Sequence, residues 1–105
     1  MKIFIIQQLY IMLSSTKLEG LTIDEKYKVL NVARELKKVS KEFEDFIKDS
    51  QESIKDNKEL NMIIEREATR EIEIKIDKLG DTFDKLLEHN DWNVSQILML
   101  EENIK

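Results

Sequence analysis

Apolar residues recur at intervals of three and four between residues 22 and 57, the spacing of one side of an α-helix. Val29 and Val32 lie off this stripe, so we expect the N-terminal half of the helix to contact neighbours on two sides. The pattern predicts one long helix over residues 22–57 that organises the rest of the chain. The stripe consists of Ile23, Tyr27, Leu30, Ala33, Leu36, Val39, Phe43, Phe46 with Ile47, and Ile54.

The start of this helix has the form of a capping box. Gly20 breaks what precedes it, and the Thr22 side chain can accept a hydrogen bond from the Glu25 amide while the Glu25 carboxylate accepts one from the Thr22 amide. Asp24 and Glu25 also place negative charge in the first turn, where the helix dipole favours it. The turn-prone residues at 56–58 predict where the helix ends.

The N-terminal segment predicts an extended start at 2–5 and then a helix from about Ile6 to Leu18. Gly20 would close that helix and allow it to fold back on the long one as a helical hairpin. Gln7 and Gln8 interrupt the apolar run after four residues, so we expect neither a signal peptide nor a membrane span, which needs roughly 20 apolar residues.

Residues 59–69 have helical spacing and predict a short helix running back along the long one. The next residues, 71–77, alternate isoleucine with charge, as in a half-buried strand. A lone strand needs a partner. Three interpretations are open: pairing of 72–77 with 2–6, pairing of 72–77 across a dimer, or continuation of the preceding helix.

Beyond Gly80, residues 82–88 predict a helical turn and residues 89–91 a loop. Asn93 and Gln96 have the spacing of a second capping box, which predicts a last helix over about 94–103. The fold class is therefore mainly α with a small β element (α+β). We expect a single domain over residues 1–105, divided into an N-terminal strand and helix (1–20), the long helix (22–57), a short helix (59–69), a strand (71–79) and C-terminal helices (82–105).

Composition supports a helix-rich, ordered chain, with 37% charged and 41% hydrophobic residues, two glycines and no proline. Without cysteine the chain has no disulfide, no thiol chemistry and no cysteine metal site. The net charge is −5, and acidic and basic residues alternate along the long helix. We therefore expect no nucleic-acid partner, because no basic stripe is evident.

No pattern of catalytic residues is present: there is no nucleophile beside a base, no glycine-rich phosphate loop and no histidine pair at metal spacing. The single histidine, His89, is expected in a solvated loop. Glutamates cluster between residues 65 and 73, but basic residues among them supply neutralising partners. We therefore expect no enzyme activity, cofactor, metal ion or small-molecule substrate.

Candidate partner-binding residues lie on the second half of the long helix and near the C-terminus. Phe43, Phe46 and Ile47 have fewer obvious intrachain partners than the first half, so they form either a dimer seam or a core contact with residues 59–69. Trp92 is either a structural contact of the last helix or an aromatic anchor, a residue type enriched at binding hot spots.

The whole chain resembles a family of short phage-encoded helical proteins of unknown function, found among the tail and virion genes of tailed phages. The resemblance rests on the opening Met1–Leu9, on the long helix with its segments 27–30 and 35–38, and on residues 71–76 followed by 94–101. It implies a virion or tail assembly or accessory factor that binds a phage or host protein, is located in the host cytoplasm or on the virion, and works as a homodimer. The alternative is a small inhibitor of a host defence protein, of the anti-CRISPR type.

Overall fold

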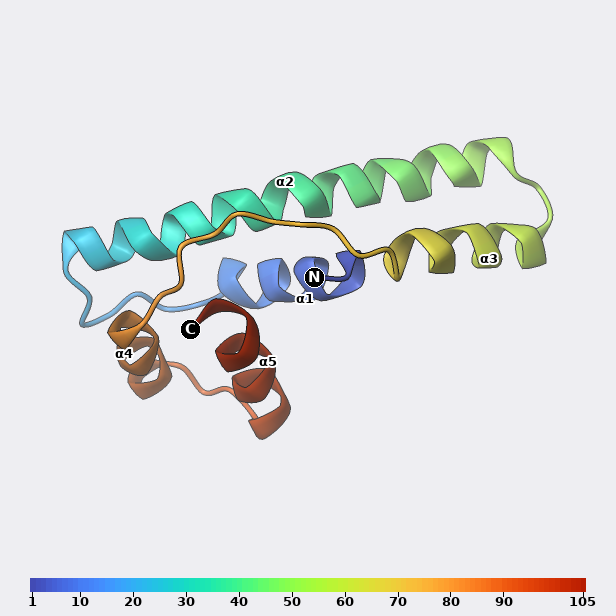
Figure 1. Cartoon of the computed structure of the whole chain (residues 1–105). Helices are drawn as coiled ribbons and strands as arrows, with labels where there is room; N and C mark the ends of the chain where they lie inside the picture. Colours follow the sequence, from blue (N-terminus) through green and yellow to red (C-terminus); the bar gives the residue numbers. More distant parts are fainter.

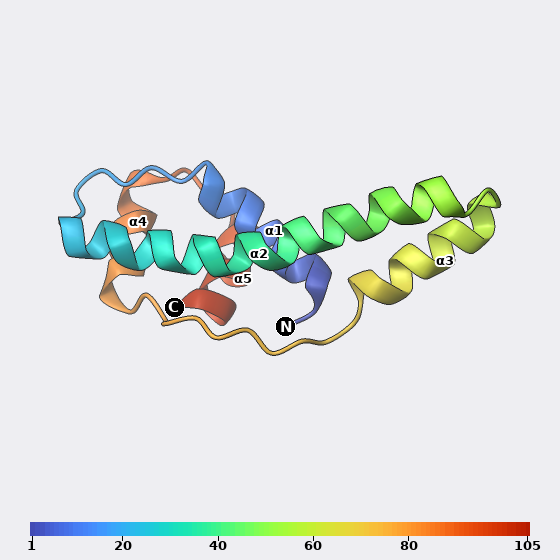
Figure 2. The same cartoon turned by 90° about the horizontal axis from the view of Figure 1, so that it is seen from above.

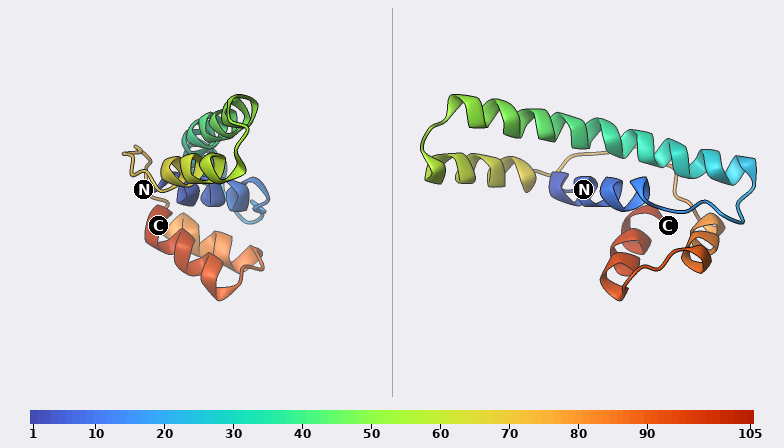
Figure 3. Two further views of the ribbon diagram at one scale, coloured as in Figure 1. Left: turned by 90° about the vertical axis from the view of Figure 1, so that its right-hand side faces the viewer. Right: turned by 180° about the vertical axis from the view of Figure 1, so that it is seen from behind.

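The computed structural model describes all 105 residues and contains five helices in three layers (Figure 1). Helix α2 forms one outer layer, α1 and α3 lie end to end beside it, and α4 and α5 cover the opposite side of α1 (Figure 3). The molecule is elongated, 49 Å long and 25 by 21 Å across. The helices are α1 (Ile3–Ser14), α2 (Ile23–Ser53), α3 (Asn57–Ala68), α4 (Asp81–His89) and α5 (Val94–Ile104).

The long helix is confirmed, with the capping box at its start. The Glu25 amide donates to Thr22 Oγ1 at 3.2 Å, and the Thr22 amide donates to Glu25 Oε1 at 2.9 Å. The helix ends at Ser53, earlier than expected, because Ile54 takes an extended conformation and Asp56 caps the start of α3. The short helix after it is also confirmed, and α3 folds back against the C-terminal half of α2 as a projecting hairpin (Figure 2).

The predicted buried stripe of α2 is wrong in its N-terminal half. Tyr27 and Leu30 are 56% and 39% exposed, whereas Val29 and Val32, which lie off the predicted stripe, are buried. Leu36, which belongs to the predicted stripe, is buried as expected. Both sets of positions have helical spacing, so periodicity alone does not say which set faces the core. Helix α1 packs against the face of α2 that carries Val29 and Val32, and this contact determines which set is buried.

The core is centred on α1, which is enclosed between α2 on one side and α4 and α5 on the other (Figure 3). Its buried residues repeat every three or four positions from the first turn, which makes the segment helical from Ile3. The expected extended start at 2–5 is therefore wrong, and the helix also ends at Ser14, before Leu18. The core cluster contains Ile6, Leu9, Leu13, Leu21, Val29, Val32, Leu36, Leu79, Phe83, Leu86, Leu100 and Ile104.

The predicted strand at 72–77, or 71–79 at its widest, is not formed as part of a sheet. The segment is extended, but its pairing with the N-terminus is limited to one antiparallel bridge between Lys2 and Glu71. Helix α1 incorporates residues 3–6, which removes the partner that a longer ladder needs. The fold is therefore mainly α, and the small β element is absent; pairing across a dimer stays a prediction.

The C-terminal helices and the Asn93–Gln96 capping box are confirmed. Instead of looping out, Asn90 ties the chain together: its side chain accepts from the Lys17 amide at 2.7 Å and donates to the Lys17 and Leu86 carbonyl oxygens. His89 is exposed, as expected, but it ends α4 rather than lying in a loop.

Candidate functional site: an open backbone edge beside a groove

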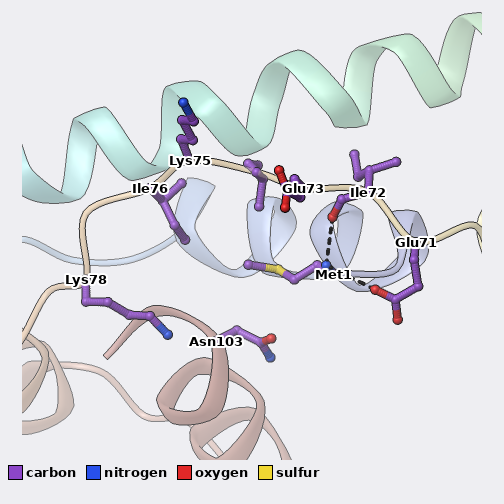
Figure 4. Close-up of a pocket in the computed structure, with 9 residues that line it drawn as sticks. Met1, Glu71, Ile72, Glu73, Lys75, Ile76, Lys78 and Asn103 are labelled. Atoms are coloured by element: carbon purple, nitrogen blue, oxygen red, sulfur yellow. Dashed lines mark hydrogen bonds and ion pairs between the residues drawn. The ribbon is translucent and has the colours of Figure 1, made fainter.

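Residues 71–76 form an extended segment that runs along the outside of α1 and α2, and the chain then turns towards α4 between Ile76 and Lys78 (Figure 1 and Figure 4). Ile72, Ile74 and Ile76 are half-buried and pack against the core, while the charged residues between them are exposed. This alternation confirms the expectation that the isoleucines share one face. The segment is thus held in a strand-like conformation by its side chains.

One end of the segment is paired with the start of the chain. The Ile72 amide donates to the Met1 carbonyl oxygen at 2.9 Å, and the Met1 ammonium donates to the Ile72 carbonyl oxygen at 2.9 Å. The Ile3 amide also donates to the Arg70 carbonyl oxygen at 3.2 Å. These bonds have the pattern of an antiparallel ladder. A Glu71 carboxylate oxygen lies 3.4 Å from the Met1 ammonium and adds an ion pair (Figure 4).

Beyond this pair the backbone edge is open. Residues 73–78 make no backbone–backbone hydrogen bond, and pairing resumes only where the Leu79 amide donates to the Ile104 carbonyl oxygen at 2.7 Å. In an extended chain, alternate residues direct their backbone groups to the same edge. The N–H and C=O groups of Ile74 and Ile76 therefore lie on the edge that Ile72 uses to bind Met1.

A groove of about 630 Å³ lies along the segment (Figure 4). Met1 and the three isoleucines supply its apolar lining, and Asn103 of α5 lies at its other wall. Asn103 Nδ2 donates to the Met99 carbonyl oxygen at 2.7 Å, so the amide oxygen remains as an acceptor. The charged lining residues Glu73, Lys75 and Lys78 take part in no ion pair within the chain. The groove therefore has an apolar floor, and the charged side chains at its rim are not in ion pairs within the chain.

The open backbone N–H and C=O groups beside this groove are of the kind that recognise a peptide backbone. An extended peptide that enters the groove can form main-chain hydrogen bonds with the open edge and place alternate side chains on the apolar lining, as in β-augmentation.

No group of three or more histidine, aspartate or glutamate residues is placed to hold a metal ion. The strongly shifted carboxylate lies elsewhere: hydrogen bonds from the Thr22 amide and Lys85 lower the pKa of Glu25 from 4.5 to about 2. It caps α2 and has a structural role.

The structure does not bring the four predicted partner-binding residues into one site. Phe43 is 5% exposed and packs within the chain, whereas Phe46 and Ile47 are half-buried where α3 runs back along α2. Trp92 lies in the α4–α5 layer and stacks on Phe83, with ring centroids 6.1 Å apart and an interplanar angle of 22°. The burial of Phe43 fits the core alternative for that residue. A partner-binding role for Phe46, Ile47 and Trp92 stays a prediction.

Sequence reasoning found the isoleucine alternation but missed Met1 and Asn103 as groove residues. No local signal identifies them, because they come from the two ends of the chain and meet only in the folded structure.

Comparison of the chain with protein-family models, curated proteins and solved structures found no match. None of the helices combines the length and the apolar character needed to cross a bilayer. The site itself is therefore the basis for the functional argument.

Proposed function

We propose that this protein is a non-enzymatic protein–protein interaction module that binds an extended segment of another protein along residues 73–76. The observation that carries the proposal is the pairing of Met1 with Ile72. Met1 occupies the first hydrogen-bonding position of the backbone edge, at Ile72. The next positions, at Ile74 and Ile76, make no backbone hydrogen bond and belong to residues that line the groove. An edge that already pairs with one antiparallel segment has the geometry to pair with more.

The ligand that fits is a short antiparallel strand. From residue 73 to residue 76 the edge spans about 10 Å at ~3.3 Å per residue, which is room for three or four ligand residues. Ligand side chains that face inward would contact Met1 and the isoleucines, and those that face outward would lie beside Glu73 and Lys75. We therefore expect ligands that alternate apolar residues with polar or charged ones.

The wider role that we propose is that of a virion or tail assembly or accessory factor in the host cytoplasm. The resemblance to short phage-encoded proteins supports it, as does a site that offers main-chain pairing and no catalytic group. An edge of this kind holds a flexible segment of another protein in place, which is a task of assembly factors.

Selection from a library of random peptides tests the proposal when it is run against the protein and against a blocked variant. The blocked variant carries Thr-Val-Thr-Val ahead of Met1. This added strand continues the antiparallel pairing, so its second and fourth residues counted outward from Met1 lie opposite Ile74 and Ile76. A variant with Gly-Ser-Gly-Ser at the same place is the matched control, because it has the same length but low strand propensity.

We expect the unmodified protein and the Gly-Ser control to enrich peptides with apolar residues at every second position, and the blocked variant to enrich none. Equal enrichment on the blocked variant, or enriched peptides without alternation, would show that the edge is not the binding site.

A further inference from the structure

The exposed face of α2 carries a stripe that changes from apolar to basic along the helix. Its members are separated by four and three residues in turn, which places them on one line along the helix. Ile23, Tyr27 and Leu30 are 72%, 56% and 39% exposed. The three basic residues that follow are exposed and take part in no ion pair. This α2 stripe is Ile23, Tyr27, Leu30, Arg34, Lys37 and Lys41.

Helix α5 carries a shorter stripe of the same design with the opposite charge. Val94 and Leu98 are 73% and 51% exposed, and they are followed by the exposed carboxylates of Glu101 and Glu102. Neither carboxylate takes part in an ion pair. This α5 stripe, residues 94, 98, 101 and 102, thus runs from apolar to acidic in the same chain direction in which the α2 stripe runs from apolar to basic.

The two stripes lie on opposite outer layers of the molecule (Figure 3). Helix α2 forms one layer and α5 belongs to the layer on the far side of α1. A chain therefore cannot join its own two stripes. The α5 stripe of one copy can, however, lie parallel to the α2 stripe of another, with apolar residues against apolar residues and acids against bases.

We propose that the protein self-associates head to tail, with the α5 stripe of one copy on the α2 stripe of the next. This contact is heterologous, so it extends into a ring or a filament rather than closing as a two-fold dimer. It is separate from the groove beside residues 73–78 and does not depend on the function proposed for that groove.

Charge favours this arrangement over the symmetric ones. Packed in parallel, two α2 stripes would bring the three unpaired cations of each copy against those of the other, and two α5 stripes would oppose carboxylates. Packed antiparallel, each stripe would place its charged end against the apolar end of the other and leave those charges without a partner. Like charges at close range are repulsive, while the α2–α5 pairing makes every such contact attractive.

A groove beside the α2 stripe adds a surface for the apolar residues of the partner copy. It holds about 400 Å³ between the end of α1 and the first half of α2, with Leu30 and Ala33 in its lining and Arg34 and Lys37 at its basic rim. An apolar side chain flanked by carboxylates, such as Leu98 beside Glu101 and Glu102, has the matching character.

Two blocked variants test the direction of the contact. Tyr27→Asp blocks the α2 stripe and Leu98→Asp blocks the α5 stripe, and both positions are exposed enough to keep the fold, which circular dichroism checks. Met62→Asp is the matched control, because Met62 is 57% exposed but belongs to neither stripe. The readout is the mass in solution by sedimentation or light scattering.

We expect the unmodified protein and the Met62 control to exceed the 12.5 kDa chain mass, with a mass that rises with protein concentration and falls with added salt. Each blocked variant alone should be monomeric. An equal mixture of the two should form a complex of twice the chain mass, since one intact α5 stripe and one intact α2 stripe remain. A monomeric unmodified protein, or a mixture that stays monomeric, would overturn the proposal, as would a loss of association in only one of the variants.

Discussion

The two leucines of α2 that the sequence places on one stripe should differ sharply in what they contribute to stability. Leu36 is fully buried in the core cluster, whereas Leu30 is 39% exposed. Leu36→Ala removes a buried side chain and leaves a cavity, which costs about 3 kcal/mol within a usual range of about 2–5 kcal/mol. At about 4–6 °C per kcal/mol for a domain of this size, the melting temperature should fall by roughly 12–18 °C.

Leu30→Ala is the matched control, because it makes the same chemical change in the same helix. Leu30 borders an open groove rather than a closed core, so the free energy of unfolding should fall by less than about 1 kcal/mol. Urea unfolding followed by the helical circular dichroism signal measures both variants. Equal losses for the two, or the larger loss for Leu30→Ala, would refute the burial of the valine side of α2. Leu36→Asp goes further and should unfold the domain, since it buries an unpaired charge.

Two other positions give separate tests. Gly20 and Gly80 both have positive φ, but a Cβ at Gly20 would lie 2.7 Å from His89 Nε2 while one at Gly80 meets nothing within 4 Å. Thermal unfolding should show a loss for both Gly→Ala changes, and Gly80→Ala should cost about 1–3 kcal/mol because φ 57°, ψ −130° lies outside the left-handed helical region and suits glycine alone. His89→Ala should change the loss at Gly20 little, since the exposed end of the imidazole can move away from the new Cβ. The folded pKa of Glu25, about 2, lies below its unfolded value near 4.5, so its contribution is present above pH 4.5 and is lost as the pH falls towards 2. Glu25→Gln should flatten the dependence of stability on pH in that window, and an unchanged acid titration would contradict this role.

The starts of α2 and α5 could be predicted from the sequence because they are encoded locally. Both capping boxes place a side chain and an amide three residues apart, so the signal does not depend on the rest of the fold. The start of α1 was predicted wrongly, because the branched and aromatic residues at 3–6 suit a strand when they are considered in isolation. Burial of Ile3 and Ile6 against α2 decides for the helix.

The sequence could not predict in the same way which face of each element is covered by another part of the chain. The N-terminal half of α2 has two apolar stripes of helical spacing, and only the position of α1 shows which one is covered. The groove was also out of reach, since it joins Met1, the segment 71–78 and Asn103, which are remote in sequence. The alternation of isoleucines could be recognised in the sequence. Whether this segment had a strand partner depended on whether residues 2–6 were extended or helical.

Amide hydrogen exchange along residues 72–76 tests the central claim most directly, because it reports on each backbone group of the edge. In the unmodified protein, the Ile72 amide should be protected by its bond to Met1, while the Ile74 and Ile76 amides should exchange rapidly. With Thr-Val-Thr-Val ahead of Met1, the Ile74 and Ile76 amides should become protected as well. Protection of Ile74 and Ile76 in the unmodified protein, or rapid exchange that persists in the extended one, would contradict an open edge that pairs with an incoming strand.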